Sequence, residues 1–402
     1  MSSITIFSKH FWPENFKINE VSFKLKKKLK INVFTSEPSY NNNKYIKNYR
    51  NNSKLNGIKV HYLKTYSRKK NTFIDIARDY ISYIIKLSLN LNYFENHKPL
   101  AAITFATSPL LQAIPAIIYA KRKKIPSILW VQDLWPEVLE DTGYIKNKFI
   151  LKFINIFVKK IYKSSDLILT QSNSFKKHIQ KNYKIKNNIF TLHQPSDFKF
   201  QKYTKNLNKK IIITFAGNLG EAQDFKTILD AFLSKNLDRN ICLNIIGSGK
   251  KFQFLKNFIR INKLKSRIIL KKYFKSNELK KYFKRSNCFI VSLKNGKSLN
   301  KTIPGKFQSY LAYGKPILVS SNGELGKFVE RERIGFSNKP NDIEKIVKNM
   351  NYIKNLKEKD KIKIYLSSKK VYQNFFDLNK IVDDLFKYIK HINKKNVKKN
   401  IP

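Results

Sequence analysis

The sequence predicts an α/β protein with two doubly wound, Rossmann-like domains that face a ligand-binding cleft between them. Short apolar segments alternate with segments of helical period along almost the whole chain, which indicates parallel strands joined by helical crossovers. At 402 residues the chain is long enough to form two separate cores. A polar, basic and unpatterned segment at 196–210 interrupts the alternation, and we interpret it as the linker. The predicted domains are therefore residues 1–197 and 198–402.

The first domain is predicted to alternate strands with helices, giving a parallel sheet that is covered on both faces. Its first strand begins at Ile4, so we expect no signal peptide before it. Pro109 marks a helix that follows the fourth strand, because proline is accepted in the first turn of a helix. The predicted strands lie at 4–8, 31–35, 58–63, 101–105, 127–131, 167–170 and 189–192, and the longer predicted helices at 17–29, 72–94, 109–123 and 147–163.

The second domain is predicted to repeat this pattern and to become mostly helical after Asp342. In open parallel sheets, ligands bind beside the carboxyl ends of the strands, so the residues that follow the strands are the first candidates for a site. The predicted strands of this domain lie at 211–215, 241–246, 268–270, 288–292 and 316–320.

The strongly basic composition favours an anionic partner. The sequence has 81 Lys and Arg against 27 Asp and Glu, a formal net charge of +54. Such a charge attracts nucleic acids, anionic membrane surfaces and phosphorylated ligands alike. The basic residues are spread over the whole chain and do not form one block. This distribution favours attraction to an anionic membrane surface over specific nucleic-acid binding.

Two further observations bear on the location of the protein. Cys242 and Cys288 both lie in predicted strands, which favours free thiols in a reducing, cytoplasmic compartment. No apolar run approaches the roughly 18 residues that would span a bilayer. The longest candidate, residues 80–94, is interrupted by Lys86 and two asparagines, which is typical of an amphipathic or groove-lining helix.

Three glycine-containing segments of the second domain indicate a phosphate-binding site. Pro304, Gly305 and Lys306 open a short predicted helix and offer backbone N–H groups, a positive helix end and an ammonium group. Gly217-Asn218 and Gly247 follow predicted strands, where glycine permits close approach of the backbone to an anion. Each segment alone is also compatible with an ordinary turn or a capped helix. Their occurrence together favours a phosphate-bearing ligand.

Acidic residues, which are scarce in the chain, gather after the fifth predicted strand. Four of them fall between Asp133 and Asp141, and Glu137 is among them. They could hold an acceptor hydroxyl or act as a general acid or base. The alternative is that Pro136 opens a helix with Asp133 as its N-cap.

Other polar residues are expected at the same edge of the first sheet. Glu14 and Asn15 follow the first strand, and Ser108 follows the fourth. The six histidines show no spacing suited to a shared metal ion, and no Asp-x-Asp element is present. The sequence therefore predicts a site without a metal.

Taken in order, these motifs resemble the large retaining glycosyltransferase family 4, which has the GT-B fold. Within that family, the chain is similar to the branch identified as N-acetyl-fucosaminyl or related deoxyhexosamine transferases of bacterial surface-polysaccharide assembly, such as O-antigen, lipopolysaccharide and capsule. The segments that carry the resemblance are Phe11-Trp12-Pro13-Glu14, Ala106-Thr107-Ser108-Pro109, Asp133-Leu134-Trp135-Pro136-Glu137, Ala216-Gly217-Asn218-Leu219-Gly220, Ile303-Pro304-Gly305-Lys306 and Asn322-Gly323-Glu324.

The resemblance implies metal-independent transfer of a sugar from a UDP-linked donor to a polyprenyl-diphosphate-linked saccharide, with no cofactor. The second domain would bind the donor and the first the acceptor, and the last helices would pack back on the first domain. Lys306 and Asp133 would be the catalytic residues, because Lys306 would neutralise the leaving diphosphate. The other donor-binding residues would be Gly217, Asn218, Gly247, Gly305, Asn322, Gly323 and Glu324, and the acceptor side would be formed by Glu14, Asn15, Ser108, Trp135 and Glu137. Such an enzyme would be peripheral on the inner face of the cytoplasmic membrane.

The chain departs from the family pattern at three places. Ser309 and Lys301 occupy the positions of two glutamates, so the residue that contacts the ribose is not assigned. Residues 15–19 replace a glycine pair that commonly follows the first strand. Gly305 stands where the branch usually has serine.

Two other functions are compatible with the sequence. A sugar-nucleotide 2-epimerase of the same fold would isomerise its sugar without a separate acceptor. A non-enzymatic nucleic-acid-binding protein would bind DNA with a steep salt dependence and would show no preference among nucleotide diphosphates.

Overall fold

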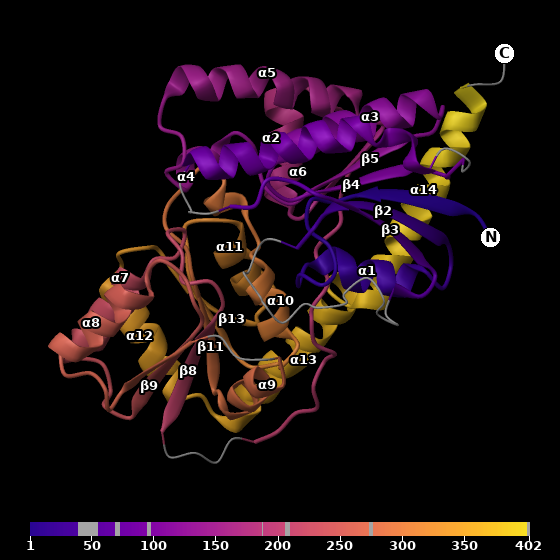
Figure 1. The fold of residues 1–402 in the computed structure, drawn as a ribbon. Helices are drawn as coiled ribbons and strands as arrows, with labels where there is room; N and C mark the ends of the chain where they lie inside the picture. The colour runs from indigo at the N-terminus through magenta and orange to yellow at the C-terminus, as the bar shows by residue number, and fades with distance from the viewer. Residues whose placement is uncertain are drawn as a thin grey trace. The chain divides into compact units, whose positions relative to one another are not determined.

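The computed structural model confirms an α/β protein with two doubly wound parallel sheets (Figure 1). The chain divides into a first unit, residues 1–195 with 378–402, and a second unit, residues 196–377. The structure describes residues 1–38, 55–68, 73–94, 98–186, 188–205, 210–272 and 276–399.

The first unit contains a seven-stranded parallel sheet in the order β3-β2-β1-β4-β5-β6-β7. The strand order reverses between β1 and β4, which makes the carboxyl ends of these two strands the switch point where open α/β sheets bind ligands. Every predicted strand of this unit is confirmed. Their bounds are β1 (Ser3–Phe7), β2 (Lys30–Ser36), β3 (Ile58–Leu63), β4 (Ala102–Ala106), β5 (Ser127–Val131), β6 (Leu167–Thr170) and β7 (Ile189–Thr191).

Helices cover both faces of this sheet. One face packs against α1 and α14, and the other against α2, α3, α5 and α6 (Figure 1). The predicted helix 72–94 is found as α2 followed by the 3-10 helix η3, and Thr72 lies outside the described residues. The helices are α1 (Lys17–Leu25), α2 (Phe73–Leu89), η3 (Leu91–Phe94), η4 (Leu110–Gln112), α3 (Ala113–Arg122), α4 (Glu137–Asp141), α5 (Lys148–Ser164), α6 (Asn173–Tyr183) and α14 (Leu378–Lys399).

The second unit contains a six-stranded parallel sheet in the order β10-β9-β8-β11-β12-β13, with its switch point between β8 and β11. The five predicted strands are confirmed. The edge strand β13 was not predicted, because its four residues include only one large apolar side chain. The bounds are β8 (Ile211–Ala216), β9 (Ile241–Ile246), β10 (Ile268–Lys271), β11 (Cys288–Ser292), β12 (Ile317–Ser320) and β13 (Gly335–Asn338).

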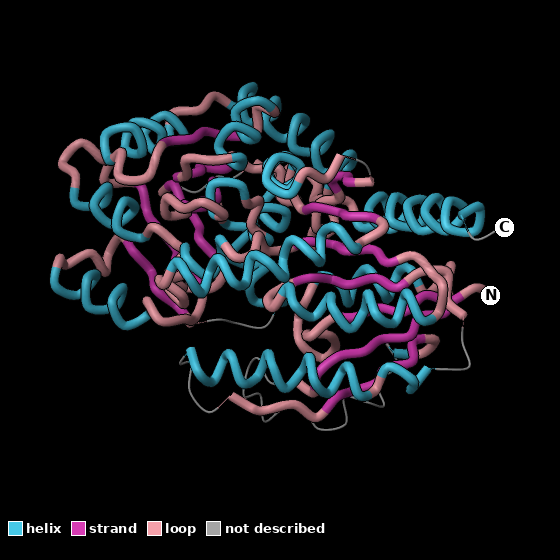
Figure 2. The backbone as a smooth tube through the Cα atoms, turned by 90° about the horizontal axis from the view of Figure 1, so that it is seen from above, coloured by secondary structure: helices cyan, strands magenta, loops and turns pink. Residues whose placement is uncertain are grey.

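Helices run alongside the strands of the second unit as well, as crossover connections require (Figure 2). One face of the sheet packs against α7, α8 and α12, and the other against α9, α10, α11 and α13. These helices are α7 (Phe225–Leu233), α8 (Phe252–Ile261), α9 (Ser276–Arg285), η5 (Leu299–Lys301), α10 (Gly305–Leu311), α11 (Glu324–Arg331), α12 (Ile343–Lys354) and α13 (Glu358–Phe375).

The interpretation of residues 196–210 as a linker is wrong for the part that the structure describes. The Ser196 amide donates to the Phe376 carbonyl at 2.9 Å, and the Gln201 amide donates to the Ala312 carbonyl at 2.8 Å. Phe198 is buried in the second core. The segment was misread because its abundant polar residues concealed aromatic side chains that anchor it to the second unit. Residues 206–209 lie outside the described part of the chain.

Candidate active site

Two glycine loops of the second unit touch each other at the carboxyl end of the sheet. The Gly217 amide donates to the Ile246 carbonyl at 2.9 Å, which joins the loop after β8 to the loop after β9. A Cβ on Gly247 would lie only 1.9 Å from the Gly217 carbonyl oxygen. Gly217 has φ of +145°, a backbone conformation that favours glycine, and a Cβ there would be 3.2 Å from Cε of Lys306. The fold therefore brings together Gly217, Gly247 and Lys306, three of the predicted donor-binding residues.

The Lys306 ammonium group is held by neutral partners. Its Nζ donates to Oε1 of Gln223 at 2.6 Å and lies 3.9 Å from the centre of the Phe215 ring. Among the described residues, no carboxylate forms an ion pair with it. Burial lowers the pKa of Lys306 to about 7. A partly buried cation without a counter-charge is an arrangement that an anionic ligand would complete.

Helix α10 carries Lys306 and is fixed against β8. The Tyr310 hydroxyl donates to the Ala216 carbonyl at 2.9 Å and accepts from the Ala216 amide at 2.6 Å. The helix begins at Gly305, and Pro304 is its N-cap. Ser309 lies one turn beyond Lys306, and its hydroxyl donates to Asp197 Oδ2 at 2.9 Å. The Asp197 carboxylate thus lies beside Ser309, one of the two positions for which the resemblance predicts a glutamate.

The remaining predicted donor residues lie at the same edge of the second sheet. Asn218 follows Gly217 and is exposed. Asn322, also exposed, and Gly323 follow β12, and Glu324 begins α11. A Cβ on Gly323 would meet backbone atoms of η5, so the two segments are in close contact. What these residues do toward a ligand stays a prediction.

In the first unit, three predicted residues from two strand ends form one hydrogen-bonded group. Asp133 Oδ2, which follows β5, accepts from the backbone amide and the hydroxyl of Ser108, both at 3.0 Å. Nε1 of Trp135 donates to the same hydroxyl at 3.1 Å. Burial raises the pKa of Asp133, and the hydrogen bonds from Ser108 partly oppose that rise.

The alternative that Asp133 caps the next helix is wrong. Helix α4 begins at Glu137, its N-cap is Pro136, and no side chain caps it. The Asp133 carboxylate points instead to Ser108 at the end of the neighbouring strand. Its position is that of a polar group at a strand end, where ligands of open sheets bind.

The three other predicted acceptor-side residues, Glu14, Glu137 and Asn15, do not belong to the hydrogen-bonded group of Asp133. Glu14 is buried, and its Oε2 lies 2.7 Å from Nδ1 of His10. Glu137 Oε1 lies 2.6 Å from Nε2 of His178. Asn15 is exposed beside Glu14. Each of the two carboxylates thus contacts a histidine within the first unit, whereas Asn15 is open to solvent.

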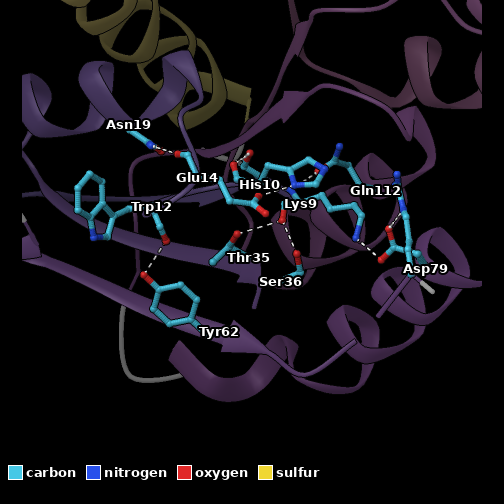
Figure 3. A network of polar contacts seen from close by, with 12 residues as sticks. Lys9, His10, Trp12, Glu14, Asn19, Thr35, Ser36, Tyr62, Asp79 and Gln112 are labelled. Atoms are coloured by element: carbon cyan, nitrogen blue, oxygen red, sulfur yellow. Dashed lines mark hydrogen bonds and ion pairs between the residues drawn. The ribbon is translucent and has the colours of Figure 1, made fainter. Parts of the chain in front are cut away.

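The sequence reasoning missed a buried ion network that follows β1 (Figure 3). Lys9 is fully buried, and its Nζ lies 2.6 Å from Oδ1 of Asp79, while Nε of Arg68 donates to the other oxygen of Asp79 at 2.7 Å. Burial lowers the pKa of Lys9 in spite of Asp79. The sequence did contain a pattern that indicates a buried carboxylate, because Asp79 lies on the apolar stripe of a helix, between Ile76 and Tyr83. No comparable signal marked Gln223.

Possible metal ligands are scattered among the residues with described positions. In that part of the chain, no group of three or more His, Cys, Asp and Glu side chains is arranged to hold a metal ion. Similarly, none of the described helices is long and apolar enough to cross a membrane.

Comparison with known proteins bears on both units. Residues 195–367 match the family model described as glycosyl transferases group 1, and this segment contains every predicted donor-binding residue. No curated protein matches the sequence. Three solved structures are similar over 97–98% of this chain and over 99–100% of their own chains. HepE from Anabaena in complex with UDP has a TM-score of 0.70 at 9% identity, and sucrose-phosphate synthase from Thermosynechococcus elongatus has a TM-score of 0.71 at 12% identity. The lipopolysaccharide outer core galactosyltransferase WaaB has a TM-score of 0.65 at 15% identity. At these identities the similarity shows the fold, which is the two-domain GT-B fold.

Proposed function

We propose that the protein is a retaining glycosyltransferase that moves a sugar from a UDP-linked donor to a lipid-linked saccharide. The observation that carries this proposal is the Lys306 ammonium group, which lies against Gly217 and has neutral partners. This group belongs to the segment that matches the glycosyl transferases group 1 model. A site of this kind suits the diphosphate of a nucleotide-sugar.

The donor is proposed to be UDP-linked because HepE, which shares the fold, has been crystallised with UDP and with UDP-glucose. The transferred sugar is proposed to be an N-acetylated deoxyhexosamine, on the resemblance of the motifs described above. Gly217, Asn218, Gly247 and Gly305 would contact the diphosphate through their backbones. The Asn322-Gly323-Glu324 segment would face the sugar or the nucleotide.

In the proposed reaction, the bond from the anomeric carbon to the diphosphate oxygen breaks and a bond to the acceptor oxygen forms. The diphosphate leaves with the bonding electrons, and Lys306 stabilises its growing negative charge. The acceptor hydroxyl gives up its proton, and Asp133 is the proposed group that holds this hydroxyl or takes the proton. The positive charge of Lys306 serves the purpose that a metal ion serves in other transferases, so we propose a metal-independent reaction without a cofactor.

The acceptor is proposed to be a polyprenyl-diphosphate-linked saccharide of bacterial surface-polysaccharide synthesis, such as O-antigen or capsule. The fold is shared with WaaB, a galactosyltransferase of the lipopolysaccharide outer core. The net charge of +54 favours a peripheral position on the anionic inner face of the cytoplasmic membrane.

The proposal is tested by incubating the purified protein with UDP-linked N-acetylated deoxyhexosamines and a polyprenyl-diphosphate-linked N-acetylhexosamine. We expect a lengthened lipid-linked product whose new linkage keeps the anomeric configuration of the donor, measured by NMR. An isomerised nucleotide-sugar without a lengthened product would contradict transfer and favour the epimerase. Asp133→Asn is expected to stop transfer without weakening UDP binding. The matched control is Asp166→Asn, because Asp166 accepts from the amide and hydroxyl of Ser127 just before β6, away from the candidate site, and this variant should retain most of the transfer rate.

A further inference from the structure

We propose that the outer side of helices α2 and α5 in the first unit is a docking face for an anionic lipid bilayer. The inference deepens the proposed function and rests on its acceptor, because a lipid-linked saccharide has to be reached at a membrane. The docking face consists of Ile81, Ile85 and Leu89 of α2 with Phe149, Phe153 and Ile156 of α5.

Helix α5 exposes large apolar side chains on successive turns. Phe149 is 81% exposed, Phe153 is 61% exposed and Ile156 is 53% exposed. Their spacing of four and then three residues aligns them on one side of the helix. The opposite side of α5 already packs in the core through Val158 and Ile161. The helix therefore has two apolar sides, and the core accounts for only one of them.

Helix α2 repeats this arrangement. Leu89 is 75% exposed, and Ile81 and Ile85 are both more than half exposed. The spacing of four residues places all three on one side of the helix. The other side packs in the core through Tyr83 and Leu87.

The two exposed stripes belong to one surface. Helix α3 contacts both α2 and α5, and the three helices lie along the same face of the seven-stranded sheet (Figure 1). Ile118 of α3 is also exposed. The exposed apolar side chains therefore lie on adjoining helices of one layer, and soluble monomers rarely expose large apolar patches.

The charges on the docking face have one sign. Helix α5 contains lysines at 148, 152, 159, 160 and 163 and no acidic residue. Helix α2 exposes Arg78 and Lys86. Its two carboxylates, Asp75 and Asp79, are buried, and they bind Tyr66 and the Lys9 network respectively. Basic groups around exposed Phe, Ile and Leu are complementary to anionic headgroups above acyl chains.

This composition favours a bilayer over a protein partner. Lysine is depleted from the centre of protein–protein interfaces. By contrast, helices that lie in the plane of a membrane surface combine Phe, Leu or Ile on one side with Lys and Arg beside them. None of the described helices can span a bilayer, so docking in the plane of the surface is the mode that these helices allow.

Helix α2 also joins the docking face to the candidate acceptor side of the same unit. Its inner side carries Asp79, which pairs with Lys9, and Tyr80, whose ring centre lies 6.5 Å from that of Trp135. The same helix thus presents Ile81 to the outside and Tyr80 toward the group of Asp133. A bilayer held against the outer side would bring a lipid-linked acceptor to the unit proposed to bind it.

The test is co-sedimentation of the full-length protein with vesicles of phosphatidylcholine that contain phosphatidylglycerol, compared with phosphatidylcholine alone. The variant Phe149→Ser/Phe153→Ser is expected to bind the anionic vesicles about tenfold more weakly than wild type, because two large apolar groups are lost. The matched control is Phe254→Ser/Ile261→Ser, which removes two exposed apolar side chains from α8 of the second unit. It should bind as wild type does.

A charge-matched pair separates the docking face from the net charge of the chain. The variant Lys152→Gln/Lys159→Gln/Lys160→Gln removes three charges from α5. A second-unit triple variant, whose substitutions are given at the end of this paragraph, removes three exposed charges from the second unit. We expect the α5 variant to lose several-fold more vesicle affinity than the second-unit variant. Equal losses would overturn the docking face, because they would reflect total charge alone. The second-unit triple variant is Lys256→Gln/Arg260→Gln/Lys263→Gln.

Two further measurements, of UDP binding and of sedimentation velocity, separate this proposal from the proposed function. UDP binding by Phe149→Ser/Phe153→Ser should equal that of wild type. If the wild-type protein binds vesicles through α5 but does not bind UDP, only the proposed transferase function is contradicted. Sedimentation velocity without lipid should show the same species for wild type and this variant. If the wild-type protein forms a dimer that this variant does not form, the face binds a second copy of the chain, and the proposal of bilayer docking is overturned.

Discussion

Two lysines with a lowered pKa, one in each unit, differ in how their charge is balanced. Lys9 follows β1 of the first unit, and its ammonium group is paired with Asp79, which Arg68 also contacts. Lys306 lies against the loop after β8 of the second unit, with Gln223 and the Phe215 ring as its partners. Burial lowers the pKa of both lysines, but a carboxylate opposes the shift only at Lys9.

The difference separates a charge that belongs to the fold from a charge that awaits a ligand. A buried ion pair is costly to break, since the remaining partner is left as an uncompensated charge. A partly buried cation without a counter-charge instead destabilises the folded state until an anion binds. From this comparison we expect the second unit to bind the diphosphate of the proposed donor, and the network around Lys9 to stabilise the strand end of the first unit.

The largest expected effect is on the transfer reaction. Lys306→Met keeps most of the length of the side chain and removes its charge. We expect the rate of sugar transfer to fall about 100- to 1000-fold, since one group that stabilises the leaving diphosphate is lost. Steady-state kinetics with the lipid-linked acceptor measure this. A loss of less than about threefold would show that the charge of Lys306 is not used.

The same substitution at the other lysine should act on stability. Lys9→Met leaves Asp79 with Arg68 alone, so we expect the free energy of unfolding to fall by about 3 kcal/mol. Urea denaturation at neutral pH measures this, with Lys306→Met as the control. That control should be no less stable than wild type, because it removes an uncompensated charge. Equal destabilisation by the two variants would contradict the comparison.

A carboxylate introduced beside Lys306 should make its surroundings resemble those of Lys9, which is paired with Asp79. Gln223→Glu would pair with Lys306, raise the pKa of that lysine and compete with the ligand. We expect the affinity for UDP to fall about tenfold, or about 1.4 kcal/mol, while thermal stability rises. Gln223→Met removes the hydrogen-bond acceptor without adding charge and should weaken UDP binding less. Tighter UDP binding by Gln223→Glu would be incompatible with an uncompensated cation.

The smallest expected effect is a pH dependence of UDP binding. Because the pKa of Lys306 is lowered to about 7, the unliganded site loses its proton as the pH rises from 6.5 to 8.5. We expect UDP affinity to fall about fivefold over this interval relative to Lys306→Arg, whose guanidinium stays charged. Calorimetric titrations of both proteins measure this. Parallel pH profiles would show that Lys306 does not titrate in that interval.

The same shift predicts the direction of the stability change with pH. The pKa of Lys306 is lower in the folded protein than in the unfolded chain, so the unfolded chain binds more protons above pH 7. The contribution of Lys306 to stability therefore improves as the pH rises from about 7 toward 10.5, the ordinary pKa of lysine.

Local sequence patterns predicted most of the fold. Apolar runs such as 127–131 and 241–246 became strands because their side chains are buried on both faces of a parallel sheet. The edge strand β13 was missed because three of its four residues are only partly buried and only one of the four is a large apolar residue. The segment at 196–205 was misread because its anchoring contacts, such as Ser196 to Phe376, join residues far apart in the sequence.

The candidate site was predictable where glycine or a strand end marked it. Gly217, Gly247 and Lys306 were predicted as a phosphate site, and the fold brings them into contact. Ser108, Asp133 and Trp135 were likewise predicted on one side and form one hydrogen-bonded group. Gln223 was not predicted, because a glutamine in a polar loop carries no local signal. Its contact with Lys306 joins residues 83 positions apart, which only the tertiary structure reveals.

The central claim, that Lys306 is an uncompensated charge for a diphosphate, is tested most directly by a calorimetric titration of UDP into two lysine variants. Lys315 is the matched control, because burial also lowers its pKa, to about 8, but its ammonium group donates to backbone carbonyls at the end of α9. We predict that Lys306→Met loses at least about tenfold in UDP affinity, more than 1.4 kcal/mol, whereas Lys315→Met binds as wild type does. Equal UDP affinities for wild type and Lys306→Met would contradict the account.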